Sequence, residues 1–399
     1  MTAGRDDAPG PAAPGRRYAL VAGGGTAGHL QPALAIAEAL VDLGHERRTI
    51  EFVGSERGQD AATLAGRGFP VTLLPGRGIV RSLAPRDVAR NLRSAAELVV
   101  AALRAVTVVG RARPRVVVAV GGYASLAGAL GAVVHRVPLV LVNVDAVPGA
   151  ANRLLGRFAK ASAVGWDGTG LPRAVVTGTP VRPAIGAVER TPDARDAARA
   201  ELGIPGDRQV VAVFGGSLGA RQINRAVDGL AQRWAGRRDV AIYHIVGRRD
   251  WGAYAHDGGA DRPTRAGPGP DGLDLVRIPY EERMPLVYAA ADLVVCRAGA
   301  MTVAELAVAG VPAVLVPLPG APGDHQTANA RVLERVGAAV LLPDIACTPT
   351  GLADVVAALL ADPDHLVAMG RAATGVGRPD AAQAGARVVE ANARPEDAS

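Results

Sequence analysis

Three glycine-rich turns lie far apart in the chain, at residues 23–28, 215–219 and 298–302, and each joins an apolar run of strand character to a helical pattern. Glycine lets the backbone turn sharply and approach a ligand closely. The helix that follows offers free N–H groups and the positive end of its dipole to an anion. The three turns therefore predict an enzyme that handles phosphate and is built from two α/β halves.

Polar side chains gather around the third turn. Glu305 lies one helical turn into the following helix, and a polar loop after the next strand carries Asp324, His325, Gln326 and Asn329. Carboxylate, imidazole and amide groups accept or donate hydrogen bonds and therefore suit the hydroxyl groups of a sugar. Together with the glycine turns, these residues predict a site for a nucleotide sugar.

Apolar runs rich in β-branched residues alternate with longer helical patterns along the chain, which predicts parallel sheets covered by helices. In the first half we expect strands at residues 18–21, 50–53, 71–74, 116–120 and 139–142. In the second half we expect them at residues 210–214, 241–246, 275–278, 293–296 and 313–316. The joint between the halves is expected within residues 178–206, with a substrate cleft between the two halves.

The length of 399 residues exceeds what one hydrophobic core usually serves and predicts two domains. With 49% hydrophobic and 21% charged residues the composition is that of a soluble protein. No apolar run reaches the roughly 18 residues of a membrane span. Residues 1–17 combine Ala, Gly, Pro and charge without an apolar stretch, so we expect a disordered tail, no secretory signal and a cytoplasmic location.

The net charge of +6 comes almost entirely from arginine, since Lys160 is the only lysine. Aromatic residues make up 3% of the chain, and no arginine run is interleaved with stacking rings, so the sequence argues against a nucleic-acid module. Anionic lipid headgroups stay open as partners. Cys296 and Cys347 have neither metal-ligand nor disulfide spacing and are expected to be reduced thiols.

Motifs distributed from Tyr18 to Val388 resemble those of one known family in order and spacing. The matching segments are Gly24-Gly25-Thr26-Ala27-Gly28-His29 with Pro32-Ala33, Gly121-Gly122-Tyr123, Gly178 with Pro180-Val181-Arg182, Gly215-Gly216-Ser217 with Gly219-Ala220-Arg221 and Asn224, Met284, Ala291-Asp292, Arg297-Ala298-Gly299-Ala300, Thr302, Glu305, and Asp324-His325-Gln326 with Asn329-Ala330. They are similar to those of the MurG family, the peptidoglycan N-acetylglucosaminyltransferases of glycosyltransferase family 28.

The resemblance implies an α/β protein of the GT-B fold, in which two facing Rossmann-like domains enclose an interdomain cleft. On this basis we expect an acceptor-binding, membrane-facing N-terminal domain over residues 18–180 and a UDP-GlcNAc-binding C-terminal domain over residues 181–380. Residues 381–399 are expected to form a helix that crosses back to the N-terminal domain, followed by a tail.

The family transfers GlcNAc from UDP-GlcNAc to the C4 hydroxyl of MurNAc in undecaprenyl-pyrophosphate-linked MurNAc-pentapeptide, which converts lipid I to lipid II. The transfer inverts the anomeric centre and needs neither metal nor cofactor. An inverting transfer needs a base beside the attacking hydroxyl, and a neutral imidazole has a suitable pKa. The resemblance implies this catalytic role for His29. The alternative is a histidine that caps or packs against the following helix.

The resemblance also implies a donor site in which helix N-termini and an arginine stabilise the leaving diphosphate in place of a metal. The implied donor residues are Thr26, Gly28, Arg182, Gly216, Ser217, Ala300, Met301, Thr302, Glu305, His325 and Gln326. Glu305 would accept hydrogen bonds from the ribose hydroxyls, and His325 and Gln326 would bind the sugar. Glu281 falls where the family contacts uracil through the backbone. The alternatives are a packing role for the glycine turns, a hinge role for Arg182 and a solvated position for Glu305.

The implied acceptor side comprises Tyr123, Asn143, Asp145 and Asn152. Here the chain departs from the family, because Asn143 replaces a glutamate and Asp145 replaces an asparagine. Leu218 also replaces the usual glutamine of the second glycine turn. Since the donor residues are better preserved than the acceptor residues, the sequence leaves open a related enzyme that glycosylates a different lipid or secondary-metabolite acceptor.

A lipid-linked acceptor requires the protein to reach the inner face of the cytoplasmic membrane. Residues 77–104 mix arginines with isoleucine, leucine and valine, a pattern consistent with a peripheral amphipathic surface. The alternative is an ordinary packed helix with a charged outer face.

Three further classes of protein explain less of the chain. Gly23, Gly25 and Gly28 fit the dinucleotide fingerprint, and Glu51 lies near the expected distance for a ribose contact. A nicotinamide-dependent oxidoreductase, however, would not need the repeated turns or the polar loop at residues 324–329. A sugar-nucleotide epimerase and a non-catalytic nucleotide-sugar binder also stay open.

Overall fold

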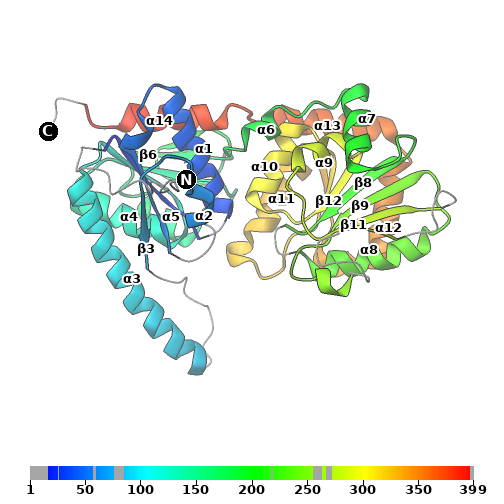
Figure 1. Ribbon diagram of the computed structural model, residues 1–399, viewed down its shortest axis with the longest axis horizontal. Helices are drawn as coiled ribbons and strands as arrows, with labels where there is room; N and C mark the ends of the chain where they lie inside the picture. Colours follow the sequence, from blue (N-terminus) through cyan, green and yellow to red (C-terminus); the bar gives the residue numbers. More distant parts are fainter. Residues whose placement is uncertain are drawn as a thin grey trace, which may run out of the picture.

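The structure, a computed structural model, describes residues 17–25, 27–56, 60–75, 85–216, 219–254, 263–266 and 272–395, with residues 27, 85–96 and 98 described by their backbone alone. These residues form two α/β domains (Figure 1). Thr26, Ser217 and Leu218 lie outside the described residues, as do residues 1–16 of the predicted tail.

The N-terminal domain is built on a parallel sheet with the strand order β3-β2-β1-β4-β5-β6-β7. Its strands are β1 (Ala19–Gly23), β2 (Ile50–Ser55), β3 (Val71–Leu74), β4 (Val116–Gly121), β5 (Leu139–Asn143), β6 (Ala161–Val164) and β7 (Ala174–Val176). Its helices are α1 (Ala27–Asp42), η1 (Arg47–Thr49), α2 (Asp60–Leu64), α3 (Pro85–Ala112), α4 (Gly122–Val134) and α5 (Ala150–Leu155).

The C-terminal domain repeats this plan with the strand order β10-β11-β9-β8-β12-β13-β14, in which β10 runs antiparallel to β11 and the other pairs are parallel. Its strands are β8 (Gln209–Phe214), β9 (Val240–Ile245), β10 (Thr264–Ala266), β11 (Asp274–Ile278), β12 (Leu293–Cys296), β13 (Ala313–Leu315) and β14 (Ala339–Leu341). Its helices are α6 (Pro183–Gly186), α7 (Pro192–Leu202), α8 (Arg221–Arg233), η2 (Trp251–Ala253), α9 (Met284–Ala290), α10 (Ala300–Ala309), η4 (Pro322–Asp324), α11 (His325–Arg335), η5 (Asp344–Ala346), α12 (Pro349–Leu360) and α13 (Pro363–Val376).

The central strands are apolar on both faces because helices cover both sides of each sheet. In β1, Ala19 and Val21 face one hydrophobic cluster, whereas Leu20 and Ala22 face another. All four residues have no exposed surface. This continuous burial explains why the strands are apolar runs without polar alternation, as parallel sheets require. The two-domain, doubly wound architecture expected from the sequence is confirmed.

The last helix, α14 (Ala381–Asn392), returns to the N-terminal domain and packs against α1, β5 and β6 (Figure 1). Glu390 Oε1 lies 2.8 Å from His45 Nε2. Beyond the helix, the backbone N–H of Arg394 donates to the carbonyl of Arg115 at 3.0 Å. The chain therefore connects the two domains twice. Among the described residues, no helix combines the length and the apolar character needed to span a bilayer.

Candidate active site

A cavity of about 450 Å³ lies between the two domains, at the carboxyl ends of the strands of both sheets. It is lined by Gly28, His29, Gln31, Val144, Asp145, Arg182, Tyr280, Glu281, Met284, Gly299, Ala300, Met301, Thr302, Glu305 and His325. A second cavity of about 140 Å³ shares Glu305 and Thr302 with it and reaches Gly216 and Tyr288. Ligand sites of α/β proteins lie at this edge of the sheet, and the size suits a nucleotide sugar.

His29 is held in the first turn of α1, against the glycine pair that begins α4. A Cβ atom on Gly121 would lie 2.4 Å from His29 Nδ1, and a Cβ atom on Gly122 would lie 2.4 Å from the carbonyl oxygen of Gly24. Their φ angles of +130° and +77° also favour glycine. The Gly121-Gly122 motif therefore leaves the space in which the imidazole fits.

Burial lowers the pKa of His29, and the carboxylates of Asp145 and Asp60 oppose that shift. His29 Nδ1 has no hydrogen-bond partner among the described residues. The imidazole is therefore neutral at pH 7 and able to take up a proton, which is the state that a general base requires.

The first glycine turn is occupied by Asp60, a residue that the sequence analysis missed. The backbone N–H of Gly25 donates to Asp60 Oδ1 and Oδ2 at 3.0 and 2.9 Å, and the N–H of Ser55 donates to Oδ2 at 2.8 Å. A Cβ atom on Gly24 would lie 2.0 Å from Asp60 Oδ2. Because a protein carboxylate already takes this anion position, the first turn supports His29 and is not an open phosphate cradle. No sequence motif marks Asp60, since it meets Gly25 only through tertiary packing.

Glu305 lies at the wall common to both cavities. Tyr288 Oη donates to Glu305 Oε2 at 2.9 Å, and Arg182 Nη2 lies 3.5 Å from Oε1. The glutamate is 9% exposed, which contradicts the alternative of a solvated helix position. Burial raises its pKa, while Arg182 and the hydroxyl of Tyr288 act in the opposite direction. Tyr288 was not predicted, because a tyrosine inside an apolar helix is typical of a core position.

The third glycine turn presents the N-terminus of α10 to the cavity. Gly299 is the N-cap residue and has no side chain that could cap the helix. Ala300, Met301 and Thr302 form the first turn and line the cavity. The free N–H groups at this end are suited to bind a phosphate. In the second turn, Gly216 has a φ of +86° and lines the smaller cavity.

At the start of α11, His325 faces the cavity, whereas Gln326 supports the preceding loop. His325 lines the cavity, and its Nδ1 donates to the carbonyl of Pro322 at 2.9 Å, which leaves Nε2 for a ligand. Gln326 Oε1 accepts from the N–H of Leu318 at 2.9 Å. Gln326 is absent from the described lining of the larger cavity.

On the acceptor side, Asp145 lines the cavity and contacts the opposite domain. Asn329 Nδ2 donates to Asp145 Oδ1 at 2.9 Å and to the carbonyl of Ala298 at 3.3 Å, and Asn329 Oδ1 accepts from the N–H of Ala146 at 2.8 Å. One asparagine of α11 thus joins the loop after β5 to the third glycine turn. Asn329 was expected among the polar residues of the sugar site, and this interdomain bridge was not predicted.

The remaining acceptor residues expected from the sequence lie behind the described cavity wall. Asn143 Nδ2 donates to the carbonyl of Asp145 at 2.7 Å, and Asn152 Nδ2 donates to Asn143 Oδ1 at 3.1 Å. Tyr123 Oη donates to the carbonyl of Leu74. Asn143 and Asn152 are 3% and 9% exposed. Their contacts shape the loop that carries Asp145 and the edge of the N-terminal sheet.

Two domain families match the two halves of the molecule. Residues 19–164 match the glycosyltransferase family 28 N-terminal domain, and residues 210–384 match the glycosyltransferase family 28 C-terminal domain. The fold and the interdomain site are therefore those of a GT-B glycosyltransferase, and the chain belongs to the MurG family within glycosyltransferase family 28.

Two relatives carry the name UDP-N-acetylglucosamine--N-acetylmuramyl-(pentapeptide) pyrophosphoryl-undecaprenol N-acetylglucosamine transferase. The protein of Nocardia farcinica is 39% identical over 381 residues, which cover 94% of this chain and 96% of that protein. The protein of Desulforudis audaxviator is 37% identical over 367 residues, covering 91% of this chain and 95% of that protein. The crystal structure of Acinetobacter baumannii MurG has a TM-score of 0.73 at 27% identity and covers 94% of this chain and 100% of that chain.

Proposed function

We propose that this protein transfers GlcNAc from UDP-GlcNAc to the C4 hydroxyl of MurNAc in undecaprenyl-linked MurNAc-pentapeptide, with inversion of the anomeric centre. The observation that carries the proposal is a single cavity that brings His29 together with Glu305 and the N-terminus of α10. The names of relatives at 37% and 39% identity favour this acceptor over a different lipid or secondary metabolite. The reaction would serve peptidoglycan synthesis, and through it cell shape and division in a bacterium.

The C-terminal domain supplies the groups that would bind the donor. Glu305 accepts hydrogen bonds from the ribose hydroxyls, and the uracil enters the smaller cavity beside Gly216. Arg182 and the free N–H groups at the start of α10 stabilise the diphosphate as negative charge develops on it. The side chain of Glu281 already accepts a hydrogen bond from Tyr243 Oη at 2.7 Å, so only the backbone of Glu281 is available to the uracil ring.

The N-terminal domain would supply the proton acceptor. The C4 oxygen of the acceptor attacks the anomeric carbon from the face opposite UDP, and the bond from that carbon to the diphosphate oxygen breaks. The neutral imidazole of His29 takes the proton of the attacking hydroxyl, and UDP leaves with the electron pair of the broken bond. Burial keeps the pKa of His29 low and so maintains the neutral imidazole before the step.

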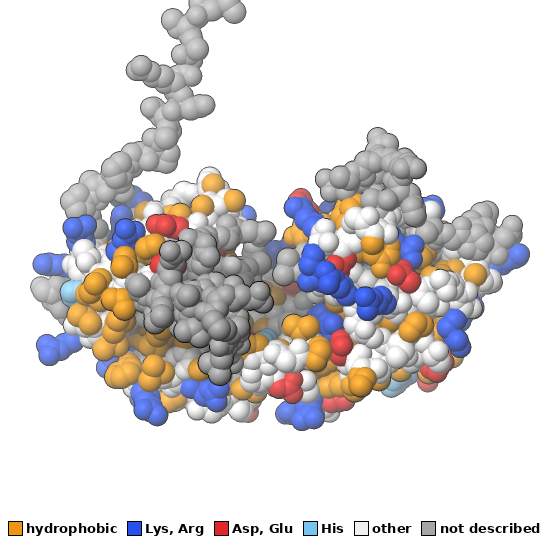
Figure 2. All heavy atoms as spheres, turned by 90° about the horizontal axis from the view of Figure 1, so that it is seen from below, with side chains coloured by type: hydrophobic (Ala, Val, Ile, Leu, Met, Phe, Trp, Pro, Cys, Tyr) orange, Lys and Arg blue, Asp and Glu red, His pale blue; other side chains and the backbone are white. Residues whose placement is uncertain are grey.

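An exposed apolar surface on the N-terminal domain supports binding to the inner face of the membrane. It comprises Val99, Val100 and Leu103 of α3, Leu126, Leu130, Val133 and Val134 of α4, and Leu154 and Phe158 at and after α5. Hydrophobic side chains gather on this domain, among basic ones, in the view of Figure 2. Apolar side chains rimmed by arginine are typical of peripheral membrane surfaces. Of the predicted segment at residues 77–104, residues 77–84 lie outside the described residues.

The proposal is tested by transfer from labelled UDP-GlcNAc to a short-chain analogue of the lipid-linked MurNAc-pentapeptide, with EDTA present. We expect a disaccharide product with wild-type protein and none with heat-denatured protein. UDP-GlcNAc binding without transfer would refute the proposed acceptor and point to Asp145 and Asn143 as the changes responsible. Loss of transfer in EDTA that added Mg²⁺ restores would refute the proposed metal independence.

A further inference from the structure

Five arginines line two adjoining cavities on the side of the C-terminal domain that faces away from the proposed active site. They are Arg190, Arg195, Arg199, Arg208 and Arg371. The cavities have volumes of about 390 and 550 Å³ and share Arg190, Arg195, Gln209 and Asp292. Gln209 begins β8 and Asp292 directly precedes β12, so the cavities lie at the amino-terminal edge of the sheet. The interdomain cavity lies at the opposite, carboxyl-terminal edge.

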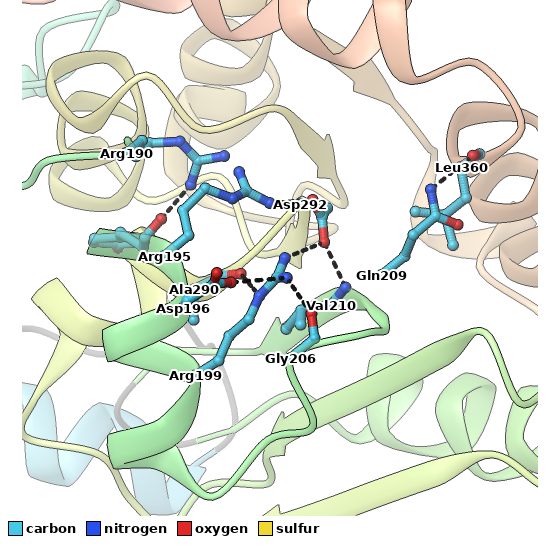
Figure 3. A network of polar contacts seen from close by, with 11 residues as sticks. Arg190, Arg195, Asp196, Arg199, Gly206, Gln209, Val210, Ala290, Asp292 and Leu360 are labelled. Atoms are coloured by element: carbon cyan, nitrogen blue, oxygen red, sulfur yellow. Dashed lines mark hydrogen bonds and ion pairs between the residues drawn. The ribbon is translucent and has the colours of Figure 1, made fainter. Parts of the chain in front are cut away.

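Asp292 neutralises only part of this positive charge. Its carboxylate accepts hydrogen bonds from Arg195 and, at 2.9 Å, from Arg199 Nη2 (Figure 3). The backbone N–H of Val210 also donates to Asp292 Oδ2, at 2.6 Å. With three donors on one carboxylate, Asp292 is fully engaged in joining α7 to β8 and β12. The remaining acidic residues of the lining, Asp196 and Asp207, are exposed.

Arg190 makes no hydrogen bond or close ion pair with a carboxylate of the described residues. Among the described residues it makes one hydrogen bond, to the backbone carbonyl of Tyr288. A guanidinium has five N–H donors. Figure 3 shows the guanidinium groups of Arg190 and Arg195 beside each other. Burial and the neighbouring charge of Arg195 lower the pKa of Arg190 to about 10, far below that of a free arginine but still high enough for it to be charged at pH 7.

The Asp292 carboxylate acts on the pKa of Arg190 in the opposite direction but does not contact Arg190 directly. A largely buried cation that no carboxylate contacts is unfavourable, and an anion that fills the cavity would relieve the repulsion between Arg190 and Arg195. The planar donor fork of arginine matches the oxygens of phosphate groups. Arg371 and Thr374 of α13 line the adjoining cavity. The Thr374 hydroxyl donates to the carbonyl of Arg371 at 2.9 Å, so the guanidinium of Arg371 provides the further donors. We propose that these cavities form a second anion site, which binds a soluble phosphate monoester or diphosphate independently of the donor nucleotide.

The test measures thermal unfolding while inorganic pyrophosphate is added, with UDP kept at saturation so that the donor diphosphate site is occupied. Sodium chloride of matched ionic strength corrects for general screening. We expect a saturable rise in the unfolding temperature of wild-type protein. In Arg190→Gln the apparent affinity for pyrophosphate is expected to fall about tenfold or more, because a charge-assisted hydrogen bond is lost.

Two further variants keep the result interpretable. Arg371→Gln removes an exposed arginine from the lining of the 550 Å³ cavity. It is expected to weaken pyrophosphate binding several-fold without a threat to folding. Arg225→Gln removes an exposed arginine of α8, outside both cavities, and should bind pyrophosphate like wild type. Glycosyl transfer without pyrophosphate should be unchanged in Arg371→Gln, since Arg371 lines neither cavity of the candidate active site.

The proposal is overturned if pyrophosphate stabilises wild-type protein no more than chloride does. It is equally overturned if Arg190→Gln and Arg371→Gln respond like wild type, because the anion would then bind elsewhere. If Arg190→Gln does not fold, Arg371→Gln decides. Sedimentation with phosphatidate vesicles tests the source of the phosphate, and an Arg190-dependent loss of vesicle binding would replace the soluble ligand with a lipid headgroup.

Discussion

The two sides of the interdomain cavity differ in how their residues reach it. On the donor side, Glu305, His325 and the first turn of α10 lie directly in the lining, whereas Gln326 bonds the backbone of its own loop. On the acceptor side, His29 and Asp145 line the cavity, whereas Asn143 and Asn152 act only on the loop behind it. In the proposed function, the donor half therefore supplies mainly groups that would contact the substrate directly, and the acceptor half supplies a proposed base supported by a scaffold. Substitutions on the two sides should accordingly separate binding from chemistry.

The largest effect is expected from His29→Ala. Removal of a positioned general base typically slows a reaction by about 10² to 10⁴. Since the imidazole lies on the acceptor side, the affinity for UDP-GlcNAc should change little. Transfer rates at saturating donor, with donor affinity from calorimetry, check both statements. If His29→Ala transfers GlcNAc at the wild-type rate, His29 is a packing residue and not the base. If donor affinity falls together with the transfer rate, the acceptor and donor sides do not act separately.

Glu305→Ala should produce the reverse pattern, with loss of donor binding as the main effect. The carboxylate is held by Tyr288 and Arg182 at the wall of both cavities, so its removal takes away the proposed ribose contact and leaves Arg182 without its partner. We expect donor affinity to fall by about 10- to 100-fold, as for a buried charged hydrogen bond. Tyr288→Phe keeps the carboxylate and should cost less. Equal donor affinity in wild type and Glu305→Ala would refute the assignment.

A third, smaller effect tests the bridge between the sides. Asn329→Asp sets a carboxylate against that of Asp145, and the two should repel each other. We expect kcat/KM to fall about tenfold, and the double variant with Asp145→Asn to recover most of the loss, because a reversed donor and acceptor pair re-forms. Asp145→Asn alone retains an acceptor oxygen for Asn329 and serves as the matched control. Strictly additive losses in the double variant would mean that the contact does not couple the domains.

The same contrast explains how far the sequence could predict the molecule. Most inner strands of both sheets were located to within a few residues, because burial on both faces produces apolar runs in the sequence. The inner strand β6 was missed, since its four residues, Ala161–Val164, include a serine and two alanines and form no β-branched run. The edge strands β7, β10 and β14 were missed, since each spans three residues, at Ala174–Val176, Thr264–Ala266 and Ala339–Leu341. The sequence also placed Glu305, His325 and the third glycine turn at one cavity, because parallel strands bring their carboxyl ends to one edge of the sheet. Their role in donor binding stays a prediction.

Residues that act through long-range contacts were not predictable in this way. Asp60 meets Gly25 across 35 positions, and Asn329 meets Asp145 across 184. Neither contact leaves a local pattern, because the partners are brought together only by packing of whole domains. Tyr288 was hidden for a related reason, since a buried tyrosine in an apolar helix shows no sign of its hydroxyl partner. Asn143 and Asn152 likewise make supporting contacts within the N-terminal domain, which is why these two predicted acceptor residues lie behind the cavity wall.

The smallest effect concerns the pH dependence of transfer. The acceptor side and the donor side of the cavity shift the pKa of the proposed base, His29, in opposite directions. Burial sets the pKa of His29 below its ordinary value of about 6.5, Asp145 raises it and His325 lowers it. The active form is the neutral imidazole, so transfer should persist below pH 6.5 and decline only as the pH falls through the lowered pKa. Asp145→Asn removes a negative charge and should move this acidic limb to lower pH.

His325→Gln removes from the donor side the imidazole that lowers the pKa of His29, and it should move the acidic limb to higher pH. The measurement is the pH profile of kcat/KM for wild type and both variants, each normalised to its own plateau, so that changes in substrate binding do not affect the comparison. Shifts of the acidic limb in opposite directions would show that both domains act on the imidazole of His29 across the interdomain cavity. Displacements of the same sign, or a limb that no variant moves, would mean that a group other than His29 carries the titration.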